Sequence, residues 1–356
     1  MAHWIATMLG VPGQIADALW GRGAREVELP RLTPREAADE AQASPRANSS
    51  LALEPGVDRY RVAGKVFGVS RSARNALVIG GLLGRAEPGG EALGALRERL
   101  AAAGFRRVLV VPVSDDEVGA VAEAGFRCVQ VASVATLDPR DFSLAGSAHA
   151  DLRQMCNRAA SRFELSVREV EPGSEEADAW LGVYDRWLSS RPMGHELKLL
   201  VGTPNIDEPL GRRYFAAFGP DGGAVAAISI TPGWGGSGYG VDIMSRDPDS
   251  PPGAMDLLMS ETITRLGDEG RERFSLGASP MAPVPGERLR APLHLRVLMN
   301  TLFRSRLGHA LFGFRALFHF KNKFAPSWHR VFLAGWPKMG FWSLYAGGRM
   351  WGLFGR

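Results

Sequence analysis

The sequence predicts an α+β fold made of two similar consecutive units, and three observations support it. From about Tyr60 onward, short apolar segments alternate with segments whose apolar residues have helical spacing. The tetrapeptide Ala-Gly-Phe-Arg occurs at 103–106 and again at 124–127, each time between a helical pattern and an apolar run. The alternation then restarts at Asp151. Two mixed units in one chain indicate a duplicated architecture.

The first unit is expected to pass from strands to helix–strand pairs. In both copies of the repeat, glycine supplies the left-handed residue that ends a helix, and the next apolar run forms a buried strand. The predicted strands are 60–70, 75–81, 105–113 and 126–133, and the predicted helices are 90–104 and 116–125.

The second unit is expected to contain a hairpin between helices. The turn signal PDGG at 220–223 lies inside a long apolar stretch, which predicts a hairpin over 214–244. The other predicted helices are 150–163, 175–190, 254–270 and an arginine-rich helix at 293–314, and the other predicted strands are 164–172 and 273–279.

The flanking segments have a different composition. Residues 34–56 are rich in Ala, Ser and Pro without sustained apolar periodicity, which predicts a linker or loose helix. The first residues, 1–23, indicate an amphipathic helix, since Pro12, Gly13 and Asp17 interrupt any apolar signal-peptide core. No uninterrupted apolar run is long enough to span a membrane. With only two cysteines, the sequence is typical of a reducing compartment.

Charge is distributed unevenly along the chain. Residues 1–287 carry 30 Lys or Arg against 38 Asp or Glu, whereas residues 288–356 carry 12 Lys or Arg and no acid, which together give the formal net charge of +4. Such a basic segment attracts polyanions, either nucleic-acid phosphates or an anionic membrane surface. A solvated basic face is the alternative.

Several ordered motifs carry a resemblance to a known family. They are DFSLAGSAHADLRQMCNRA at 141–159, YGVDIM at 239–244 with AMDLLM at 254–259, FSLGASPMA at 274–282 and FHFKNKFAPSWHRVFLA at 318–334. Over roughly residues 58–335 the chain resembles the catalytic domain of lysylphosphatidylglycerol synthetases of the DUF2156 type, which use aminoacyl-tRNA as the amino-acid donor.

The resemblance implies two GNAT-like acyltransferase domains in tandem with a basic helix that helps to dock tRNA. The implied division is 1–57 for the N-terminal helix and linker, 58–150 and 151–335 for the two GNAT-like domains, and 336–356 for an aromatic and basic tail. An aminoacyl ester is already activated, so this chemistry needs positioning, proton removal and oxyanion stabilisation but no cofactor or metal. CxxC, HExxH, GxSxG and Walker spacings are lacking.

Asp242 ends an apolar strand, and the resemblance implies that it holds the donor's α-ammonium or orients the acceptor. The alternative is an aspartate that only caps a strand end. The family pattern has arginine three residues later, where this chain has Ser245 followed by Arg246. On a strand, one residue moves a side chain to the other face, so this departure argues against phosphatidylglycerol as acceptor. Ser275, in FSLGASPMA, is a further candidate for positioning donor or acceptor.

His195 and Glu196 are adjacent ionisable residues, and either is a candidate general base. The alternative is that the pair anchors a loop through hydrogen bonds.

The motif at 318–334 supplies the candidate tRNA contacts. Lys321 and Lys323 occupy alternate positions, so on an extended segment they face the same side and can hold neighbouring phosphates or face an oxyanion. Further candidate phosphate-binding residues are Arg304, Arg306, Arg315 and Arg330. The tail after Lys338 has the Trp, Phe, Leu and Arg composition of a membrane interface, or else packs under the N-terminal helix.

These observations favour an aminoacyl-tRNA-dependent aminoacyltransferase with a small hydroxylamine or hydroxyl acceptor, as in the valanimycin-pathway seryl transferase that the chain also resembles. One alternative is a phosphatidylglycerol aminoacyltransferase. A second is a non-catalytic RNA- or membrane-binding module. The expected partners are aminoacyl-tRNA and a small-molecule or lipid acceptor, with a location in the cytoplasm or on the inner face of the cell membrane.

Overall fold

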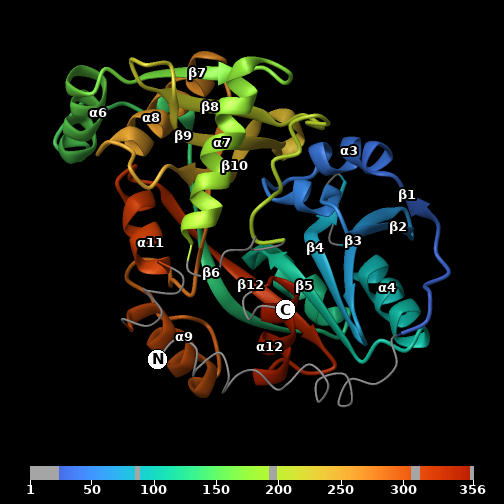
Figure 1. The fold of residues 1–356 in the computed structure, drawn as a ribbon. Coiled ribbons are helices and arrows are strands. Elements are labelled where there is room, and N and C mark those ends of the chain that lie inside the picture. Colours follow the sequence, from blue (N-terminus) through green and yellow to red (C-terminus); the bar gives the residue numbers. More distant parts are fainter. Residues whose placement is uncertain (1–23, 85–88, 192–198, 306–312, 353–356) are drawn as a thin grey trace.

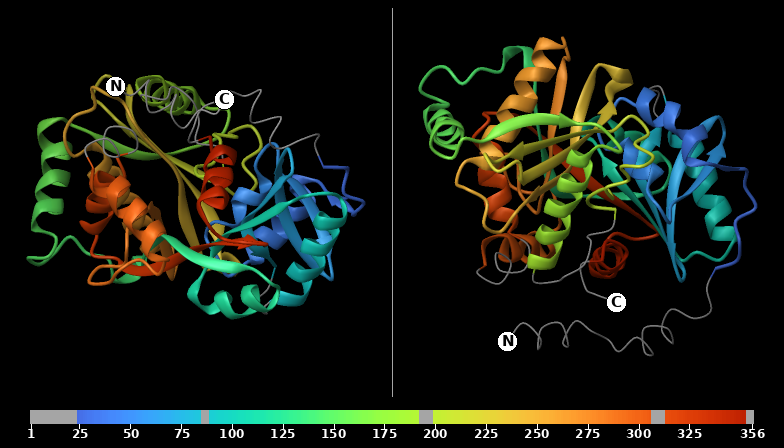
Figure 2. Two further views of the ribbon diagram at one scale, coloured as in Figure 1. Left: turned by 90° about the horizontal axis from the view of Figure 1, so that it is seen from below. Right: turned by 45° about the horizontal axis from the view of Figure 1, so that its top comes forward.

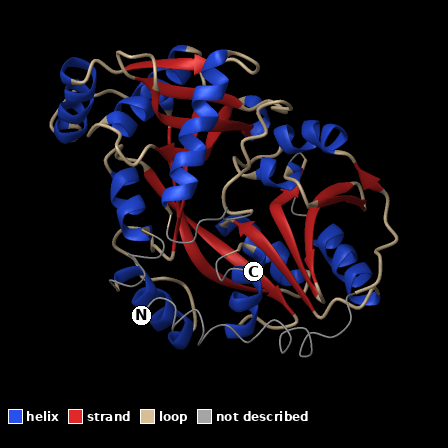
Figure 3. Ribbon diagram, in the orientation of Figure 1, coloured by secondary structure: helices blue, strands red, loops and turns tan. Residues whose placement is uncertain are grey.

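A computed structural model describes residues 24–84, 89–191, 199–305 and 313–352. Within these residues, twelve strands form one mixed sheet with helices on both sides (Figures 1 and 3). The strand order is β1-β2-β3-β4-β5-β12-β6-β11-β10-β9-β8-β7. The α+β class predicted from the sequence is confirmed.

The first half of the sheet contains a β-meander followed by two helix–strand units. Its strands are β1 (Arg31–Leu32), β2 (Asp58–Val62), β3 (Lys65–Ser72), β4 (Asn75–Leu83), β5 (Arg107–Val113) and β6 (Arg127–Leu137). Its helices are α3 (Pro34–Ala43), α4 (Gly90–Ala102) and α5 (Val118–Glu123), with short 3-10 helices η1 (Ser49–Leu53), η2 (Asp115–Glu117) and η3 (Pro139–Asp141).

The second half repeats this plan with longer helices. Its strands are β7 (Ser166–Val170), β8 (Arg213–Phe218), β9 (Ala224–Gly233), β10 (Gly238–Arg246) and β11 (Arg273–Pro280). Its helices are α6 (Ala150–Arg162), α7 (Glu175–Ser190) and α8 (Ala254–Asp268), with the 3-10 helix η4 (Trp234–Gly236). The chain ends with α9 (Leu293–Arg304), α11 (Phe314–Asn322), β12 (Ser327–Trp336) and α12 (Phe341–Met350).

Each half contains one parallel strand pair, β4 with β5 and β10 with β11, in an otherwise antiparallel sheet. A helix, α4 or α8, connects the two strands of each pair, as parallel neighbours require. The halves also exchange strands, because β12 inserts between β5 and β6, and β6 pairs with β11. This exchange makes the two halves one continuous sheet, as two further views show (Figure 2).

Residues 34–56 were expected to form a linker or a loose helix, and the structure has the helix α3 followed by η1. Helix α3 begins with a capping box formed by Thr33 and Glu36, and every residue of η1 is buried. Small side chains carry the packing here: a Cβ atom placed on Gly68 of β3 would lie 2.6 Å from the Cβ of Ala52. Because alanine contributes little to an apolar pattern, the periodicity that normally predicts a helix is weak in this segment.

The segment 318–330 also differs from the expected extended conformation. Residues through Asn322 belong to α11, a turn follows at Ala325 with φ +47°, and only then does β12 begin. The helix carries Phe314, Phe318 and a buried Lys321, so its inward face is set by helical spacing and not by alternation. The assumption that Lys321 and Lys323 lie on one side of a strand is therefore wrong.

Candidate functional site

The two strands β10 and β11 separate near the middle of the second half. Their parallel pairing runs only from Gly238 to Gly240. Beyond it, β10 stays paired with β9 and β11 stays paired with β6, and both strands are irregular at this point. Asp242 is the extra residue of the β10 bulge, which lies between Val241 and Ile243. A bulge re-aims a side chain, and here it directs the carboxylate of Asp242 away from the regular alternation of the strand.

Asp242 belongs to a buried cluster of three charged groups that joins the two halves. The Nε atom of Arg212 donates to Asp242 Oδ2 at 2.9 Å, and Arg212 Nη2 donates to Glu54 in the first half. The three side chains are between 2 and 4% exposed. Two carboxylates face one guanidinium, so the fully ionised cluster carries one excess negative charge.

Burial opposes ionisation of Glu54 and Arg212. Desolvation raises the pKa of Glu54 above its ordinary value, although Arg212 acts in the opposite direction. Desolvation also disfavours charged Arg212, but the attraction of Asp242 and Glu54 outweighs it and raises the pKa of the guanidinium. Arg212 thus stays charged, and an added cation would stabilise the two carboxylates further.

The segment before β8 completes the cluster with backbone donors. The amide of Gly202 donates to Asp242 Oδ1 at 3.1 Å, and the amide and hydroxyl of Thr203 donate to Glu54 Oε2 at 2.9 and 2.7 Å. A Cβ atom at Gly202 would overlap the Asp242 carboxylate, so only glycine permits this approach. The segment therefore fixes both carboxylates in place.

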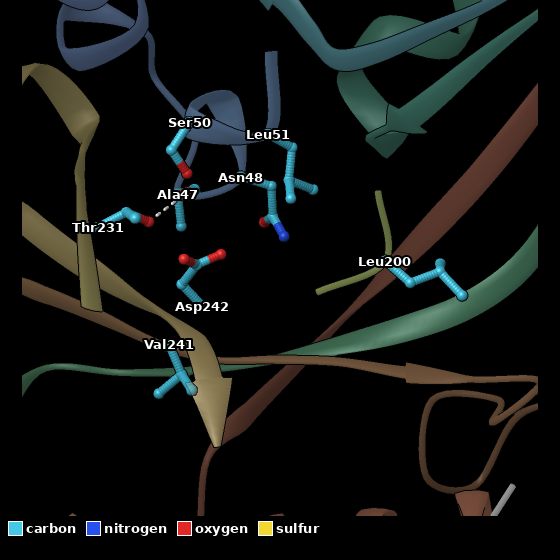
Figure 4. A pocket seen from close by; sticks show the side chains of 8 residues that line it. All are labelled: Ala47, Asn48, Ser50, Leu51, Leu200, Thr231, Val241 and Asp242. Carbon is cyan, nitrogen blue, oxygen red and sulfur yellow. Dashed lines mark hydrogen bonds between the residues drawn. The ribbon is translucent and has the colours of Figure 1, made fainter. Parts of the chain in front are cut away.

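A small pocket opens at this cluster, between η1 and the β9–β10 edge of the gap. Figure 4 shows the Asp242 carboxylate and the side chains of Ser50 and Asn48 extending toward the same space. Thr231 on the opposite wall donates to the carbonyl of Ala47 at 3.4 Å. The pocket is lined by Ala47, Asn48, Ser50, Leu51, Leu200, Thr231, Val241 and Asp242. Hydroxyl, amide and carboxylate groups converge there with few apolar neighbours.

Lys321 lies beside the same gap but inside the protein. Its Nζ donates to the carbonyl of Ala278 at 2.7 Å and lies 3.3 Å from the position of a Cβ on Gly277. A Cβ atom on Gly277 would also lie 3.7 Å from the carbonyl oxygen of Val241 in β10. The Lys321 ammonium is therefore close to both strands at the point where β10 and β11 separate. Burial lowers the pKa of Lys321 to about 7. At 4% exposure it does not reach a phosphate on the surface.

Lys323 has a different environment. Its Nζ donates to Asp256 Oδ1 at 2.6 Å, in the first turn of α8. The two lysines thus anchor α11 at separate places, and only Lys321 lies beside the gap.

The other predicted positioning residues lie along the same two strands. Ser245 is fully buried and donates to the carbonyl of Ala227 at 3.2 Å, whereas Arg246 is exposed. Ser275 is buried at the β11 irregularity, where its hydroxyl accepts from the amide of Gly277 at 3.1 Å. In this chain, position 245 therefore serves the packing of β10 against β9, and Ser275 supports the backbone next to Lys321.

The predicted phosphate-binding residues are not all available to phosphates, since Lys321 is buried and Arg330 is paired. Arg330 is paired with Glu287 and Asp115, which come from earlier in the chain. Arg304 is exposed on α9, and Arg315 is exposed on α11 with its Nε 3.3 Å from His319. Arg306, His195 and Glu196 lie outside the described residues. The expected single cradle of cations is therefore wrong for the described part of the basic region.

Sequence reasoning missed Glu54 and Arg212. Glu54 falls in the segment that was expected to be a linker, and Arg212 stands in an Arg-Arg pair before a strand, where no spacing rule applies. Proximity to Asp242 is the only signal that identifies them, and it exists only in the folded chain.

The part of the chain that the structure describes lacks two features. Among residues 24–84, 89–191, 199–305 and 313–352, no group of three or more His, Cys, Asp and Glu side chains could hold a metal ion. None of the helices described for this chain combines the length and apolar character needed to cross a bilayer.

The chain is similar to proteins of one known family. Residues 38–335 match the family model described as "Phosphatidylglycerol lysyltransferase, C-terminal". "Lysylphosphatidylglycerol biosynthesis bifunctional protein LysX" of Mycobacterium ulcerans is 32% identical over 177 residues, which are 47% of this chain and 15% of the relative. The protein of the same name from Nocardia farcinica is 29% identical over 231 residues, 62% of this chain and 19% of the relative. The match thus spans less than a fifth of these relatives.

Two solved structures share the fold. The C-terminal DUF2156 domain of a putative lysylphosphatidylglycerol synthetase from Agrobacterium fabrum superposes with a TM-score of 0.72 at 22% identity, covering 89% of this chain and 95% of that one. L-PGS from Bacillus licheniformis gives a TM-score of 0.71 at 20% identity, covering 94% and 97%.

Proposed function

This chain belongs to the family of phosphatidylglycerol lysyltransferase C-terminal domains, and on that premise we propose that it transfers an aminoacyl group from aminoacyl-tRNA to a hydroxyl group of phosphatidylglycerol. The names of the matched relatives support the lipid acceptor over the small hydroxylamine that the sequence favoured. The buried position of Ser245 removes the main objection to the lipid, because that objection assumed that residue 245 faces the acceptor.

The carboxylate of Asp242 on the pocket wall is the observation that carries this proposal. An aminoacyl ester has a free α-ammonium group, and a pocket walled by a carboxylate from a cluster of two carboxyl groups and one guanidinium stabilises such a cation. Asp242 already accepts hydrogen bonds from Gly202, Arg212 and Ser229, but a carboxylate offers about four acceptor positions. One of them is left for an ammonium in the pocket.

The reaction needs little beyond positioning. The acceptor oxygen forms a bond to the ester carbonyl carbon, the bond from that carbon to the ribose oxygen breaks, and the proton of the acceptor hydroxyl ends on the ribose oxygen. Fixing the donor's ammonium at Asp242 places its carbonyl, two bonds away, near the gap between β10 and β11. Lys321 faces this gap and is a positioning residue that keeps the two strands apart.

The tRNA and the lipid reach the site from surfaces that carry exposed cations. Arg315 on α11 and Arg158 and Arg162 on α6 are exposed, and Arg153 in the first turn of α6 donates to the carbonyls of Leu144 and Gly146 in the motif loop before it. We assign tRNA phosphates to this side. His195 and Glu196 remain candidates for the general base.

The proposal is tested by removing the charge from the donor. Wild-type protein is incubated with phosphatidylglycerol and either aminoacyl-tRNA or N-acetyl-aminoacyl-tRNA, and label in the lipid is measured. A charge-assisted hydrogen bond contributes about 1.5–3 kcal/mol, so the free amine should be preferred about 10- to 100-fold. In Asp242→Asn this preference should disappear, because the amide carries no negative charge to bind the α-ammonium. The variant should use aminoacyl-tRNA and N-acetyl-aminoacyl-tRNA at similar low rates.

The matched control is Asp256→Asn, a buried aspartate paired with Lys323 away from the pocket, which should keep the preference. A wild-type protein that uses both donors equally would refute the role of Asp242. Label transferred only to an added hydroxylamine would instead overturn the lipid acceptor. A catalytically inactive chain that still binds tRNA or vesicles would support the non-catalytic alternative.

A further inference from the structure

We propose that helices α9 and α12 form a face that docks on an anionic lipid bilayer. The described part of the chain leaves four large apolar side chains exposed, and all four lie on these two helices: Leu293 at 66%, Val297 at 55%, Phe341 at 45% and Trp342 at 55%. Scattered exposed apolar residues are normal, but their confinement to two neighbouring helices marks an interaction surface. The inference rests on the proposed function in that the acceptor would be a membrane lipid.

The face of α9 follows from its helical spacing. Leu295 and Met299 are buried, while Leu293 and Val297, one turn apart from each other, lie on the opposite side. At 100° per residue, Arg304 falls on the same side as Leu293. The helix is thus amphipathic in an unusual sense, with an apolar inner side and an outer side that mixes aliphatic residues with cations.

Helix α12 stands next to α9 over a shared cluster. Leu295 and Met299 of α9 pack in one cluster with Leu344 of α12 and with Met339, which precedes α12. The two helices lie at the same end of the molecule (Figures 1 and 2). Phe341 and Trp342 begin α12 and pack edge-to-face at 5.4 Å between ring centroids. Aromatic side chains of this kind prefer the headgroup level of a bilayer.

The positive charge around α9 and α12 favours an anionic partner. The region 288–356 contains no Asp or Glu, and no carboxylate of the described chain pairs with Arg296, Arg304 or Lys338. Arg290 and Arg330, by contrast, pair with carboxylates, Arg290 with Asp115 and Arg330 with both Asp115 and Glu287. Unpaired cations around exposed apolar side chains match a bilayer with anionic headgroups and an apolar interior.

The same features disfavour RNA. Cations and aromatic rings suit RNA, but exposed leucine and valine gain nothing from phosphates or bases and would be left in water. Arg304 was a candidate for tRNA phosphates. Its place beside Leu293 and Val297 assigns it to the lipid surface instead.

The experiment is flotation of the full chain with vesicles. Wild-type protein should bind vesicles of phosphatidylglycerol and phosphatidylcholine and should bind vesicles of phosphatidylcholine alone much less. Val297→Glu combined with Trp342→Glu should lower the partition to anionic vesicles about tenfold or more. The control adds the same two negative charges elsewhere, as Gln42→Glu on α3 with Ser166→Glu on β7, both exposed and at other sides of the molecule, and should bind normally.

Transfer to short-chain phosphatidylglycerol dispersed in detergent separates this inference from the proposed function. The Val297→Glu, Trp342→Glu variant should retain that transfer, because the site at Asp242 is untouched. Vesicle binding without transfer to any lipid would refute the proposed function and leave the docking face standing. Equal binding by wild type and variant would refute the face. Displacement of the wild type from vesicles by uncharged tRNA, or unmasking of binding only after removal of residues 1–23, would also overturn it, since RNA or the N-terminal segment would then occupy the surface.

Discussion

The two parallel strand pairs begin alike and end differently. In the first half, β4 and β5 pair over five positions, from Asn75 to Ile79, before the glycines Gly80 and Gly81 with positive φ. A Cβ atom on Gly80 would lie 3.0 Å from the carbonyl oxygen of Ser49 and 3.2 Å from the Cβ of Ala52, so η1 closes this position. In the second half, β10 and β11 pair over three positions and part at Asp242, where polar groups line a pocket.

One short helix serves both places. The residues of η1 that close the first strand pair neighbour Ser50 and Leu51, which line the pocket at the second. Glu54, directly after η1, then reaches Arg212 and through it Asp242. In this duplicated architecture, the first half therefore supplies a packed wall for the second. The place where two parallel strands separate is filled in the first half and holds a pocket in the second.

The largest expected loss of stability comes from removing Arg212, which links the two halves of the sheet. Arg212→Met leaves Glu54 and Asp242 buried without their cation, which should lower the free energy of unfolding by about 3–5 kcal/mol and abolish transfer. The adjacent Arg213→Met should cost clearly less, because its network with Glu169 and Glu269 is partly exposed to water. Urea unfolding measures both variants. Equal losses would mean that the buried cluster does not hold the halves together.

The next effect concerns Lys321, the buried lysine beside the second strand pair. The unfolded chain keeps the Lys321 proton up to about pH 10.5, whereas the folded protein releases it near pH 7, so this residue makes stability rise with pH across that window. The slope is about 1.4 kcal/mol per pH unit. Lys321→Met lacks the rise, and its free energy of unfolding relative to wild type should therefore fall by about 2 kcal/mol from pH 7 to pH 9, because the full slope is reached only above pH 7.

Urea unfolding at the two pH values provides the measurement, and Lys323→Met, which removes a partly exposed ion pair, is the control without this dependence. Parallel pH profiles of wild type and Lys321→Met would show that the ammonium is hydrated in solution.

The smallest effect tests the closed strand pair. Gly80→Ala forces a side chain into left-handed backbone against η1, which should cost about 1–2 kcal/mol and leave the transfer rate per folded molecule unchanged. Gly94→Ala, in the middle of α4 with open space around the new methyl group, should instead raise stability by about 0.5–1 kcal/mol. Thermal unfolding distinguishes the two. A loss of transfer in folded Gly80→Ala would mean that the first strand pair takes part in catalysis.

Local patterns predicted most of the elements. The helix expected at 175–190 is α7 with the same bounds, and the turn at PDGG joins β8 to β9 with Gly222 at φ +81°. The ordered motifs predicted the family, which is confirmed. The strand β12 was missed because its neighbours β5 and β6 come from the other half, so nothing near it in sequence indicates pairing.

What the sequence determined by itself is what short-range physics controls: helical and strand periodicity, turns, the excess of cations after Glu287, and Asp242 as a carboxylate of an apolar strand. The prediction that Asp242 ends this strand is wrong, because β10 continues past it to Arg246. The tertiary structure decided which charges meet. Arg212 binds Glu54, 158 residues away in the sequence, and Asp242, 30 residues away. Arg330 forms an ion pair with Asp115, and Lys321 is buried. The reason is that a charge acts according to its distance and burial, and both are set by the exchange of strands between the halves, which no local pattern records.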